Sequence, residues 1–371
     1  MASAAVDEFM RLALAQAGRA RLVCPPNPAV GCVLVGTDGS VIGEGHTQAV
    51  GQAHAEVMAL RDAARQGHSI TGATAYVTLE PCSHQGRTGP CCDALVAAGV
   101  HKVVAAVEDP NPRVAGQGFA RLRAAGVVVE VGLGAEPSRE LNIGFFSRMR
   151  RGQPWVRMKA ASSLDGRTAL PNGASQWITS DAAREDGHAW RARACAVLTG
   201  IGTVLQDDPR LDVRLPGATR QPMLVIIDSR LETPLGARLW GAVPRPLLIY
   251  TAQTDAARQQ PLAERGAEVV ALPDARGKVD LTAMLRDLAR REVNEVHVEA
   301  GHKLNGSLLR EGLVDELLLY QAPLLLGEGQ GIAALGPLAE LAQGTRLEWR
   351  AVDHIGPDLR VRARMAGREP F

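Results

Sequence analysis

The chain has 371 residues, of which 46% are hydrophobic and 22% charged, and its formal net charge is +1. This length suggests two domains, each able to bury its own core, and the composition is too apolar for a disordered chain. No run of about 18 apolar residues and no basic segment before an apolar core is present, so we expect a cytoplasmic protein without a membrane partner. Acidic and basic side chains balance within residues 1–150, and aromatic residues make up only 4%. Nucleic acid is therefore not an expected partner.

The first part of the chain alternates between strand and helix patterns. An amphipathic pattern predicts a helix over residues 6–20. Short β-branched runs predict strands at 30–35, 74–79, 102–107 and 127–131, with helices between them at about 53–66, 91–99 and 117–125. This alternation predicts an α/β layer architecture with a parallel or mixed sheet. It breaks over 132–154, which places a boundary near 148 and predicts an N-terminal domain of residues 1–148.

The alternation restarts in residues 149–371, which predicts a second α/β domain with its own sheet. Its expected strands lie at 155–160, 196–199, 223–228, 246–250, 268–272 and 295–299. Its expected helices lie at 180–193, 280–291 and 303–312. Three late runs, at 317–320, 347–352 and 359–364, predict a closing antiparallel portion.

A histidine and a group of cysteines indicate a metal site in the first domain. Six cysteines are too few for a disulfide scaffold, but Cys82, Cys91 and Cys92 lie close together in the sequence. One imidazole, from His54, and two thiolates would leave the fourth position of a tetrahedral zinc ion open for water, which is typical of a catalytic site. Glu56, two residues after His54, matches the proton-carrying glutamate of the H-x-E signature of zinc-dependent nucleobase deaminases.

The cysteine spacing departs from that signature, which continues P-C-x-x-C. After Cys82 the next cysteine is Cys91, with Cys92 beside it, and both are candidates for the third ligand. A structural zinc module would need four protein ligands and no spare carboxylate, so the pattern favours an enzyme. The main alternative is a tRNA or nucleoside deaminase with an unrelated C-terminal domain, but such a protein would show P-C-x-x-C, and a tRNA binder would carry a basic face.

Several motifs together resemble one family. In the first half they are Pro26-Asn27-Pro28, VGCV (30–33), HAEV (54–57) and TLEPCSHQGRTGPC (78–91), and in the second half they are SLDGRTA (163–169), SQWITS (175–180), DDPRLDVR (207–214) and VEAG (298–301). In this order they resemble the bacterial bifunctional deaminase–reductases of riboflavin biosynthesis. The resemblance implies zinc-dependent deamination of 2,5-diamino-6-ribosylamino-4(3H)-pyrimidinone 5′-phosphate, followed by NADPH-dependent reduction of its ribosyl group, which gives 5-amino-6-ribitylamino-uracil 5′-phosphate.

The resemblance also implies the folds and the site residues. The first domain should be cytidine-deaminase-like and the second dihydrofolate-reductase-like. The implied zinc ligands are His54, Cys82 and Cys91, with Glu56 as proton carrier. The implied NADPH positions are Ala161, Trp177, Thr203, Asp207, Ser229 and Gly301. The implied substrate positions are Asn27, Ser175, Arg191, Leu211, Arg214 and Glu299. Lys159 and Glu299 lie near two strand ends, a placement that fits two roles equally well: protonating and positioning the sugar, or forming a buried ion pair.

Two positions depart from the family pattern. Gly89 stands where proline is usual, and His46 comes one residue before the position, Thr47 here, at which the family usually has a histidine. The resemblance further implies a small phosphorylated pyrimidine as the partner and a homodimer or homotetramer as the assembly.

Overall fold

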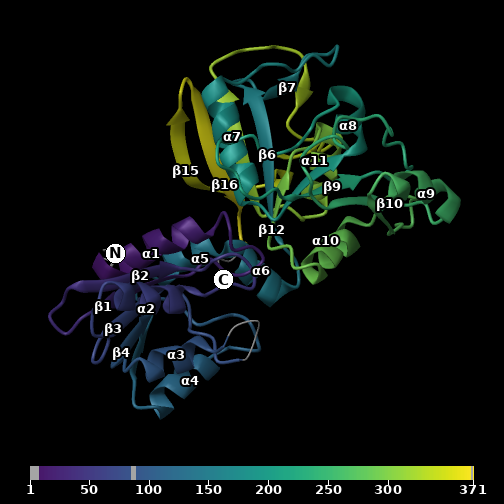
Figure 1. The fold of residues 1–371 in the computed structure, drawn as a ribbon. Helices are drawn as coiled ribbons and strands as arrows, with labels where there is room; N and C mark the ends of the chain where they lie inside the picture. Colours follow the sequence, from purple (N-terminus) through teal and green to yellow (C-terminus); the bar gives the residue numbers. More distant parts are fainter. Residues whose placement is uncertain (1–7, 85–88, 369–370) are drawn as a thin grey trace. The chain divides into compact units, whose positions relative to one another are not determined.

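The computed structural model describes residues 8–84, 89–368 and 371. The chain folds as two compact units; the first runs to Gly152 and also includes Phe371, and the second begins at Gln153 (Figure 1). The expected boundary near 148 falls inside a helix that continues to Arg151. This helix ends there because Gly152, at φ +66°, adopts the left-handed conformation that terminates helices. Within the described residues, no helix has the length and apolar character needed to span a membrane.

The first unit is a sheet with helices on both faces. The strand order is β2-β1-β3-β4-β5, with β1 antiparallel to β2 and β3, and with β3, β4 and β5 parallel. The strands are β1 (Gly31–Val35), β2 (Val41–His46), β3 (Thr74–Val77), β4 (Lys102–Ala105) and β5 (Val128–Val131). The helices are α1 (Glu8–Ala20), α2 (Ala55–Arg65), α3 (Cys91–Ala97), α4 (Gln117–Ala124), α5 (Ala135–Leu141) and α6 (Ile143–Arg151).

Alternate side chains of the first sheet face two separate cores. Val33 and Val104 pack with Met10 of α1 on one face, whereas Leu34 and Val103 pack on the other face with residues of α2, α3 and α4. The sheet is therefore buried on both sides, as in the α/β/α layering that the alternation of patterns predicts.

Glycines let two helices touch the sheet backbone. A Cβ at Gly31 would lie 1.9 Å from the Ala13 carbonyl oxygen of α1, and a Cβ at Gly45 would lie 2.4 Å from the Ala55 carbonyl oxygen of α2. No larger residue fits at these positions without moving a helix. This close approach holds the amino end of α2, where His54 and Glu56 lie, against the end of β2.

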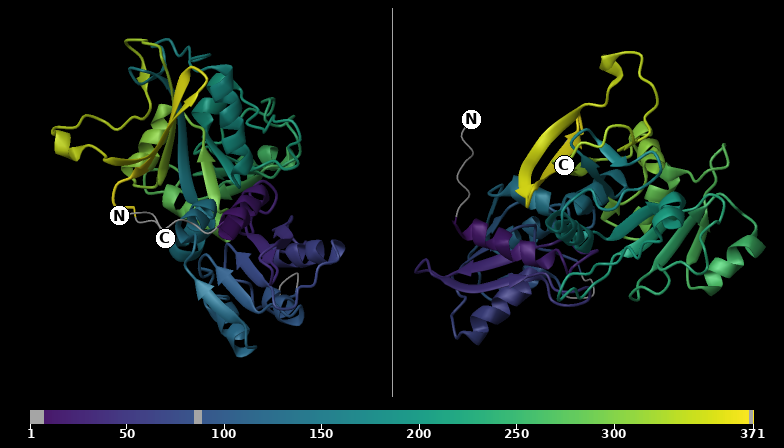
Figure 2. Two further views of the ribbon diagram at one scale, coloured as in Figure 1. Left: turned by 90° about the vertical axis from the view of Figure 1, so that its left-hand side faces the viewer. Right: turned by 90° about the horizontal axis from the view of Figure 1, so that it is seen from above.

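The second unit is built on a nine-stranded sheet, in the order β11-β10-β9-β8-β12-β6-β13-β16-β15. Neighbouring strands are parallel from β11 to β13, and β16 and β15 complete the sheet in antiparallel pairing, as the sequence predicts; Figure 2 shows β16 and β15 in yellow. Its strands are β6 (Trp155–Ser163), β8 (Ala196–Gly200), β9 (Met223–Ile227), β10 (Leu247–Thr251), β11 (Glu268–Ala271), β12 (Glu295–Val298), β13 (Glu316–Ala322), β15 (Leu347–Ile355) and β16 (Asp358–Met365).

Helices and short elements complete this unit. The helices are α7 (Asp181–Arg193), α8 (Ile201–Asp207), α9 (Ala256–Glu264), α10 (Leu281–Arg290) and α11 (His302–Arg310), with the 3₁₀ turn η1 (Leu341–Gln343). A separate two-stranded sheet pairs β7 (Arg167–Ala169) with β14 (Gln330–Gly331).

The sequence patterns did not predict several elements, each for a local reason. The strand β2 contains Gly43 and Gly45, which weaken a strand pattern but admit α2. The helices α5 and α6 fill the stretch where the alternation breaks; Pro137 sits in the first turn of α5 and Gly144 near the start of α6, and both residues weaken a helical pattern. The helix α9 contains Pro261.

A buried ionic layer lies on one face of the second sheet. Arg157 on β6 is 1% exposed and contacts Glu316 on β13 through Nε at 2.5 Å and Glu295 on β12 through Nη1 at 2.6 Å. Glu295 also lies 3.4 Å from Arg193 of α7, and the guanidinium of Arg157 stacks over the Trp190 ring at 4.7 Å. The opposite face of the same strands is apolar. Glu316 also lies 3.3 Å from Arg364 of β16, so each carboxylate has a second arginine, but Arg157 is the partner that both share and that lies closest to each.

Arg157→Met should therefore destabilise the second unit by about 3–5 kcal/mol, because it leaves two buried carboxylates without their shared partner. All five tryptophans of the chain lie in the second unit, so urea unfolding followed by tryptophan fluorescence reports on it. The control is Arg230→Met, which removes the exposed pair with Glu232 in the same unit and should cost less than about 1 kcal/mol. Equal effects of the two changes would contradict the assignment.

Candidate functional site

Three donor atoms converge in the first unit. His54 is the N-cap of α2, Cys82 follows β3, and Cys91 is the first residue of α3. The His54 Nδ1 atom lies 3.6 Å from the Cys82 Sγ and 3.4 Å from the Cys91 Sγ, and all three atoms are within 4.8 Å of one another. Tetrahedral zinc, with its usual bond lengths, would separate a nitrogen and a sulfur ligand by about 3.6 Å. The donor set fits a zinc ion with one position left for water.

The neighbouring cysteine points elsewhere. The Cys92 thiol donates to the Pro81 carbonyl oxygen at 3.1 Å and lies 3.5 Å from that of Gly118. Its side chain packs in the core of the first unit. The structure thus brings Cys91, and not Cys92, to His54 and Cys82. Residues 85–88 of the motif between Cys82 and Cys91 lie outside the described residues.

The two converging thiols shift each other's pKa in opposite directions. A hydrogen bond from the Cys91 thiol lowers the pKa of Cys82 to about 4, and the Cys91 backbone N–H also faces the Cys82 sulfur at 3.4 Å. The same thiol contact and burial raise the pKa of Cys91. One thiolate is therefore ready for a metal, and binding displaces the proton of the other.

Glu56 occupies the first turn of α2 beside this group. It is 3% exposed, and burial raises its pKa to about 7. Its negative charge also raises the pKa of the Cys91 thiol. The carboxyl group is thus next to the donor set without being part of it.

Glu80 is a buried carboxylate that sequence reasoning missed. It accepts backbone N–H hydrogen bonds from Asp109 at 3.1 Å, Gly116 at 2.9 Å and Gly118 at 2.8 Å, and from Phe119 at 3.3 Å. These bonds attach the loop after β4 and the start of α4 to the segment that leads to Cys82. The available signal was an acidic residue between a buried strand and the Pro81-Cys82 pair.

In the second unit, predicted residues gather where parallel strands end. Because β9, β8, β12 and β6 are parallel neighbours, their carboxyl ends share one edge of the sheet. Ala161 lies on β6, Ser229 follows β9, Thr203 and Asp207 lie on α8 after β8, and Gly301 follows β12. The Gly301 N–H donates to the Thr203 hydroxyl at 3.1 Å, which joins the starts of α8 and α11.

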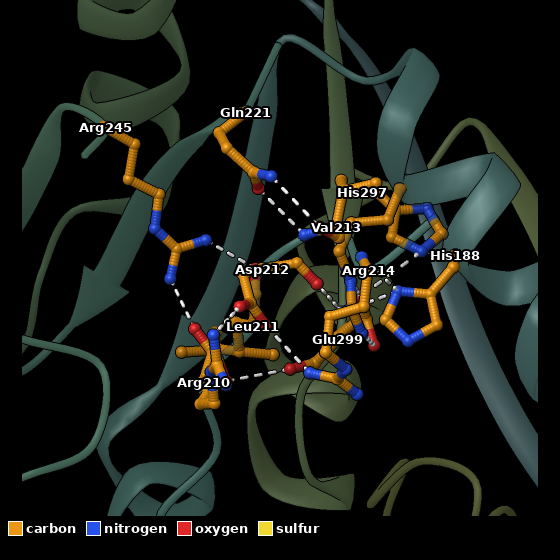
Figure 3. Close-up of polar contacts among 12 residues, drawn as sticks. His188, Arg210, Leu211, Asp212, Val213, Arg214, Gln221, Arg245, His297 and Glu299 are labelled. Carbon is orange, nitrogen blue, oxygen red and sulfur yellow. Dashed lines mark hydrogen bonds and ion pairs between the residues drawn. The ribbon is translucent and has the colours of Figure 1, made fainter. Parts of the chain in front are cut away.

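Glu299 forms a two-pronged ion pair with Arg191 of α7. The Arg191 Nε and Nη2 atoms contact the two Glu299 oxygens at 2.6 and 2.9 Å, and Arg191 Nη1 donates to the Asp212 carbonyl oxygen at 2.5 Å. Arg191 and the other positive charges nearby hold the pKa of Glu299 well below its usual range, although burial acts in the opposite direction. Burial lowers the pKa of His297 to about 3, and this imidazole lies 3.6 Å from Glu299 (Figure 3).

Lys159 lies on the strand next to Glu299. Val298 pairs with Met158, so Lys159 and Glu299 occupy neighbouring positions on adjacent strands. Burial lowers the pKa of Lys159, while the charge of Glu299 opposes that change. No ion pair of the described residues joins the two groups directly, since the fork of Arg191 occupies Glu299. Lys159 is 5.8 Å from the centre of the Tyr320 ring.

The segment 207–214 folds around Asp212, which is buried. Its carboxylate pairs with Arg210 at 2.6 Å and with Arg214 at 2.8 Å, and the Arg214 side chain is half exposed (Figure 3). Arg245 donates to the carbonyl oxygens of Arg210 and Leu211. Leu211 has φ +53°, an uncommon conformation for a residue with a side chain, and such conformations cluster at functional sites.

The remaining predicted residues are more dispersed. Trp177 is 68% exposed and stacks against Arg184 at 4.5 Å, and Ser175 lies two residues before it in the loop ahead of α7. The Ser229 hydroxyl accepts from the Val279 N–H at 3.2 Å. Across the residues that the structure describes, no hydrogen bond or ion pair joins Ser175, Trp177 or Ser229 to Glu299. Asn27 belongs to the first unit, where its N–H donates to the Cys24 carbonyl oxygen at 2.9 Å.

Comparison with protein families assigns both units. Residues 4–107 match the cytidine and deoxycytidylate deaminase zinc-binding region, and residues 154–361 match the RibD C-terminal domain. The second match leaves no support for the alternative of a tRNA or nucleoside deaminase with an unrelated C-terminal domain.

Whole-chain relatives agree with this assignment. The riboflavin biosynthesis protein RibD of Escherichia coli is 46% identical over 95% of this chain and 97% of its own length, and that of Aquifex aeolicus is 39% identical over 95% and 96%. Among solved structures, Acinetobacter baumannii RibD, form 1, superposes with a TM-score of 0.88 at 42% identity, covering 96% of this chain and 98% of its own.

A fourth relative is described as an enzyme with two activities. It is a diaminohydroxyphosphoribosylaminopyrimidine deaminase/5-amino-6-(5-phosphoribosylamino)uracil reductase from Thermotoga maritima, with a TM-score of 0.86 at 32% identity over 96% of this chain and 98% of its own. The expected fold class and the resemblance drawn from the motifs are both confirmed. The chain belongs to the RibD family of riboflavin biosynthesis proteins, in which a deaminase and a reductase are joined in one polypeptide.

Proposed function

We propose that this chain first deaminates 2,5-diamino-6-ribosylamino-4(3H)-pyrimidinone 5′-phosphate and then reduces the ribosyl group of the product to ribityl with NADPH. The observation that carries the proposal is the convergence of His54, Cys82 and Cys91 beside the buried Glu56, in a chain whose second unit matches the RibD C-terminal domain. A donor set with three ligands and an adjacent carboxyl group suits hydrolysis rather than a structural metal site.

In the deaminase, each residue has a distinct task. His54, Cys82 and Cys91 hold the zinc ion, which when bound supplies a strong water-derived nucleophile at neutral pH. Glu56 takes a proton from the attacking water and delivers it to the amine, which leaves as ammonia. Asn27 binds the edge of the pyrimidine, since a side-chain amide both donates and accepts hydrogen bonds.

In the reductase, bound NADPH would supply a hydride for C1′ of the ribosyl group. Lys159 provides the accompanying proton, and Glu299, held in place by Arg191, orients the sugar. The proposed NADPH-binding residues are Ala161, Trp177, Thr203, Asp207, Ser229 and Gly301. The other proposed substrate-binding residues are Ser175, Leu211 and Arg214; of these, Arg214 is suited to the 5′-phosphate because half of its side chain remains exposed.

We assign the deaminase to residues 1–148 and the reductase to residues 149–371, and we place the protein in the cytoplasm as a homodimer or homotetramer. An exposed sheet edge supports an assembly. Among the residues that the structure describes, β15 pairs with β16 on one side and with no strand on the other, and it exposes 71% of Trp349 and 58% of Val352. Unpaired edges with large apolar side chains favour pairing with another chain.

The oligomer can be tested by Trp349→Glu, which places a charge on this edge. Sedimentation should show a dimer or larger species for the unchanged protein. The variant should raise the dissociation constant of this oligomer at least about tenfold, because a charge on the edge weakens the association. An unchanged protein that sediments as a monomer would contradict the proposal.

The ligand assignment predicts different zinc contents for two neighbouring variants. Cys91→Ala should lose the stoichiometric zinc and the release of ammonia, because it removes one of three ligands. Cys92→Ala should keep the zinc and lose stability only, since its thiol bonds to backbone in the core. Metal analysis of the purified proteins measures both. Zinc loss in the Cys92 variant with retention in the Cys91 variant would reverse the assignment.

The two reactions should be separable by single substitutions. Glu56→Gln should keep zinc and slow ammonia release by about 10²–10⁴-fold, with reduction of the deaminated substrate unchanged. Lys159→Ala should do the converse, slowing NADPH oxidation and sparing ammonia release. Each variant is the control for the other. Full deaminase activity in the Glu56 variant would refute its role, and equal loss of both activities would indicate a folding defect.

A further inference from the structure

A side-chain amide holds the loop that carries Asn27. Asn142, between α5 and α6, is 4% exposed. Its Oδ1 atom accepts the Ala29 N–H at 2.7 Å and its Nδ2 atom donates to the Ala29 carbonyl oxygen at 3.0 Å, across 113 positions of sequence. One side chain thus satisfies both peptide groups of one residue, as a neighbouring strand would.

The two hydrogen bonds at Ala29 continue the hydrogen-bond pattern of β1 on the amino-terminal side of the strand. The next two N–H groups, of Val30 and Gly31, donate to the buried hydroxyls of Thr47 at 3.2 Å and Thr78 at 3.1 Å. The strand itself begins at Gly31, so Ala29 lies before its first strand partner. Asn142 therefore fixes the backbone two residues after Asn27, which itself is only partly buried.

The second unit contains the same arrangement. The Gln221 Oε1 atom accepts the Val213 N–H at 2.8 Å, and its Nε2 atom donates to the Val213 carbonyl oxygen at 3.0 Å (Figure 3). Val213 is buried and lies between Leu211 and Arg214. Here too one side-chain amide bonds both peptide groups of one residue beside proposed substrate-binding side chains, although Gln221 comes from the same connection between α8 and β9, eight residues further along the chain.

Neither an ionised carboxylate nor an apolar side chain can make this contact. Asparagine and glutamine carry a donor and an acceptor on one planar group, whereas a carboxylate only accepts and leucine does neither. Neither Asn142 nor Gln221 belongs to the proposed catalytic or binding residues. Their shared geometry restricts a loop that otherwise would have to be ordered when substrate binds, and such ordering lowers apparent affinity.

We propose that Asn142 and Gln221 are positioning residues, each of which clamps one substrate loop in its binding conformation, Asn142 for the pyrimidine in the deaminase and Gln221 for the phosphorylated sugar in the reductase. The proposal rests on the proposed function, through Asn27 and Arg214. It assigns the two clamps to separate reactions, so that each serves as the control for the other.

The experiment measures kcat and KM for both reactions in the full-length, zinc-loaded protein. Ammonia release is followed with the diamino substrate, and NADPH oxidation with the deaminated substrate supplied directly. Asn142→Leu should raise the KM for deamination about tenfold, with kcat within about twofold and with zinc content and reduction unchanged. Gln221→Leu should raise the KM for reduction in the same way and leave deamination unchanged.

Two further pairs of variants keep the result decisive. If a leucine variant does not fold, Asn142→Asp and Gln221→Glu retain size and the acceptor oxygen but place a carboxylate against a carbonyl, and they should raise the same KM. Asn27→Ala and Arg214→Ala report on the loops themselves. If they raise KM and the clamp variants do not, the clamps are refuted; if they leave KM unchanged, the binding assignment fails and the clamp proposal falls with it. A fall in kcat alone, or a change in both reactions, would also overturn it.

Discussion

Buried carboxylates organise both units, because a charge removed from water is tolerated only where hydrogen-bond donors or opposite charges compensate it. In the first unit, Glu80 collects four backbone N–H groups and so binds the loop after β4 to the segment carrying Cys82. In the second unit, Glu299 collects the fork of Arg191, and Arg157 joins Glu295 to Glu316. These contacts hold the segment that leads to Cys82 in the first unit and Glu299 at the strand end in the second.

The two units place their reactive groups by different means. In the first, direct contact between glycine in β2 and the backbone of α2 fixes His54 and Glu56 at one end of a layered sheet. In the second, the carboxyl ends of parallel strands supply the edge on which Thr203 and Gly301 meet. Hydrolysis needs a compact donor set, whereas hydride transfer needs an extended edge for a large cofactor, and each fold meets its own requirement.

Local pattern in the sequence was sufficient for much of this structure. The alternation of strands and helices and the closing antiparallel strands are confirmed. The residue types indicated a metal site but left Cys91 and Cys92 open, and the donor atoms of His54, Cys82 and Cys91, the set that the family resemblance implies, lie within 4.8 Å of one another. The strand β2 and the helices α5 and α6 were missed because glycine or proline interrupts their local patterns: Gly43 and Gly45 in β2, Pro137 in α5 and Gly144 in α6.

The features that the sequence did not predict depend on contacts between residues far apart in the chain. A strand-end pair of Lys159 and Glu299 is a reasonable expectation from the sequence, but α7 brings Arg191 to Glu299 from 108 positions away. The attachment of Asn142 to Ala29 is equally remote. Neither partner carries a local signal, since an arginine or asparagine on a helix is most often solvated.

The central claim is that one chain carries out both reactions in order. Its most direct test follows ammonia and NADPH absorbance together, using the purified zinc-loaded protein and the diamino-ribosylamino-pyrimidinone phosphate. The account predicts that ammonia appears first and that NADPH loss follows, and that omitting NADPH leaves ammonia release intact. Ammonia release with no NADPH consumption would contradict the reductase assignment, and absence of both signals would contradict the account as a whole.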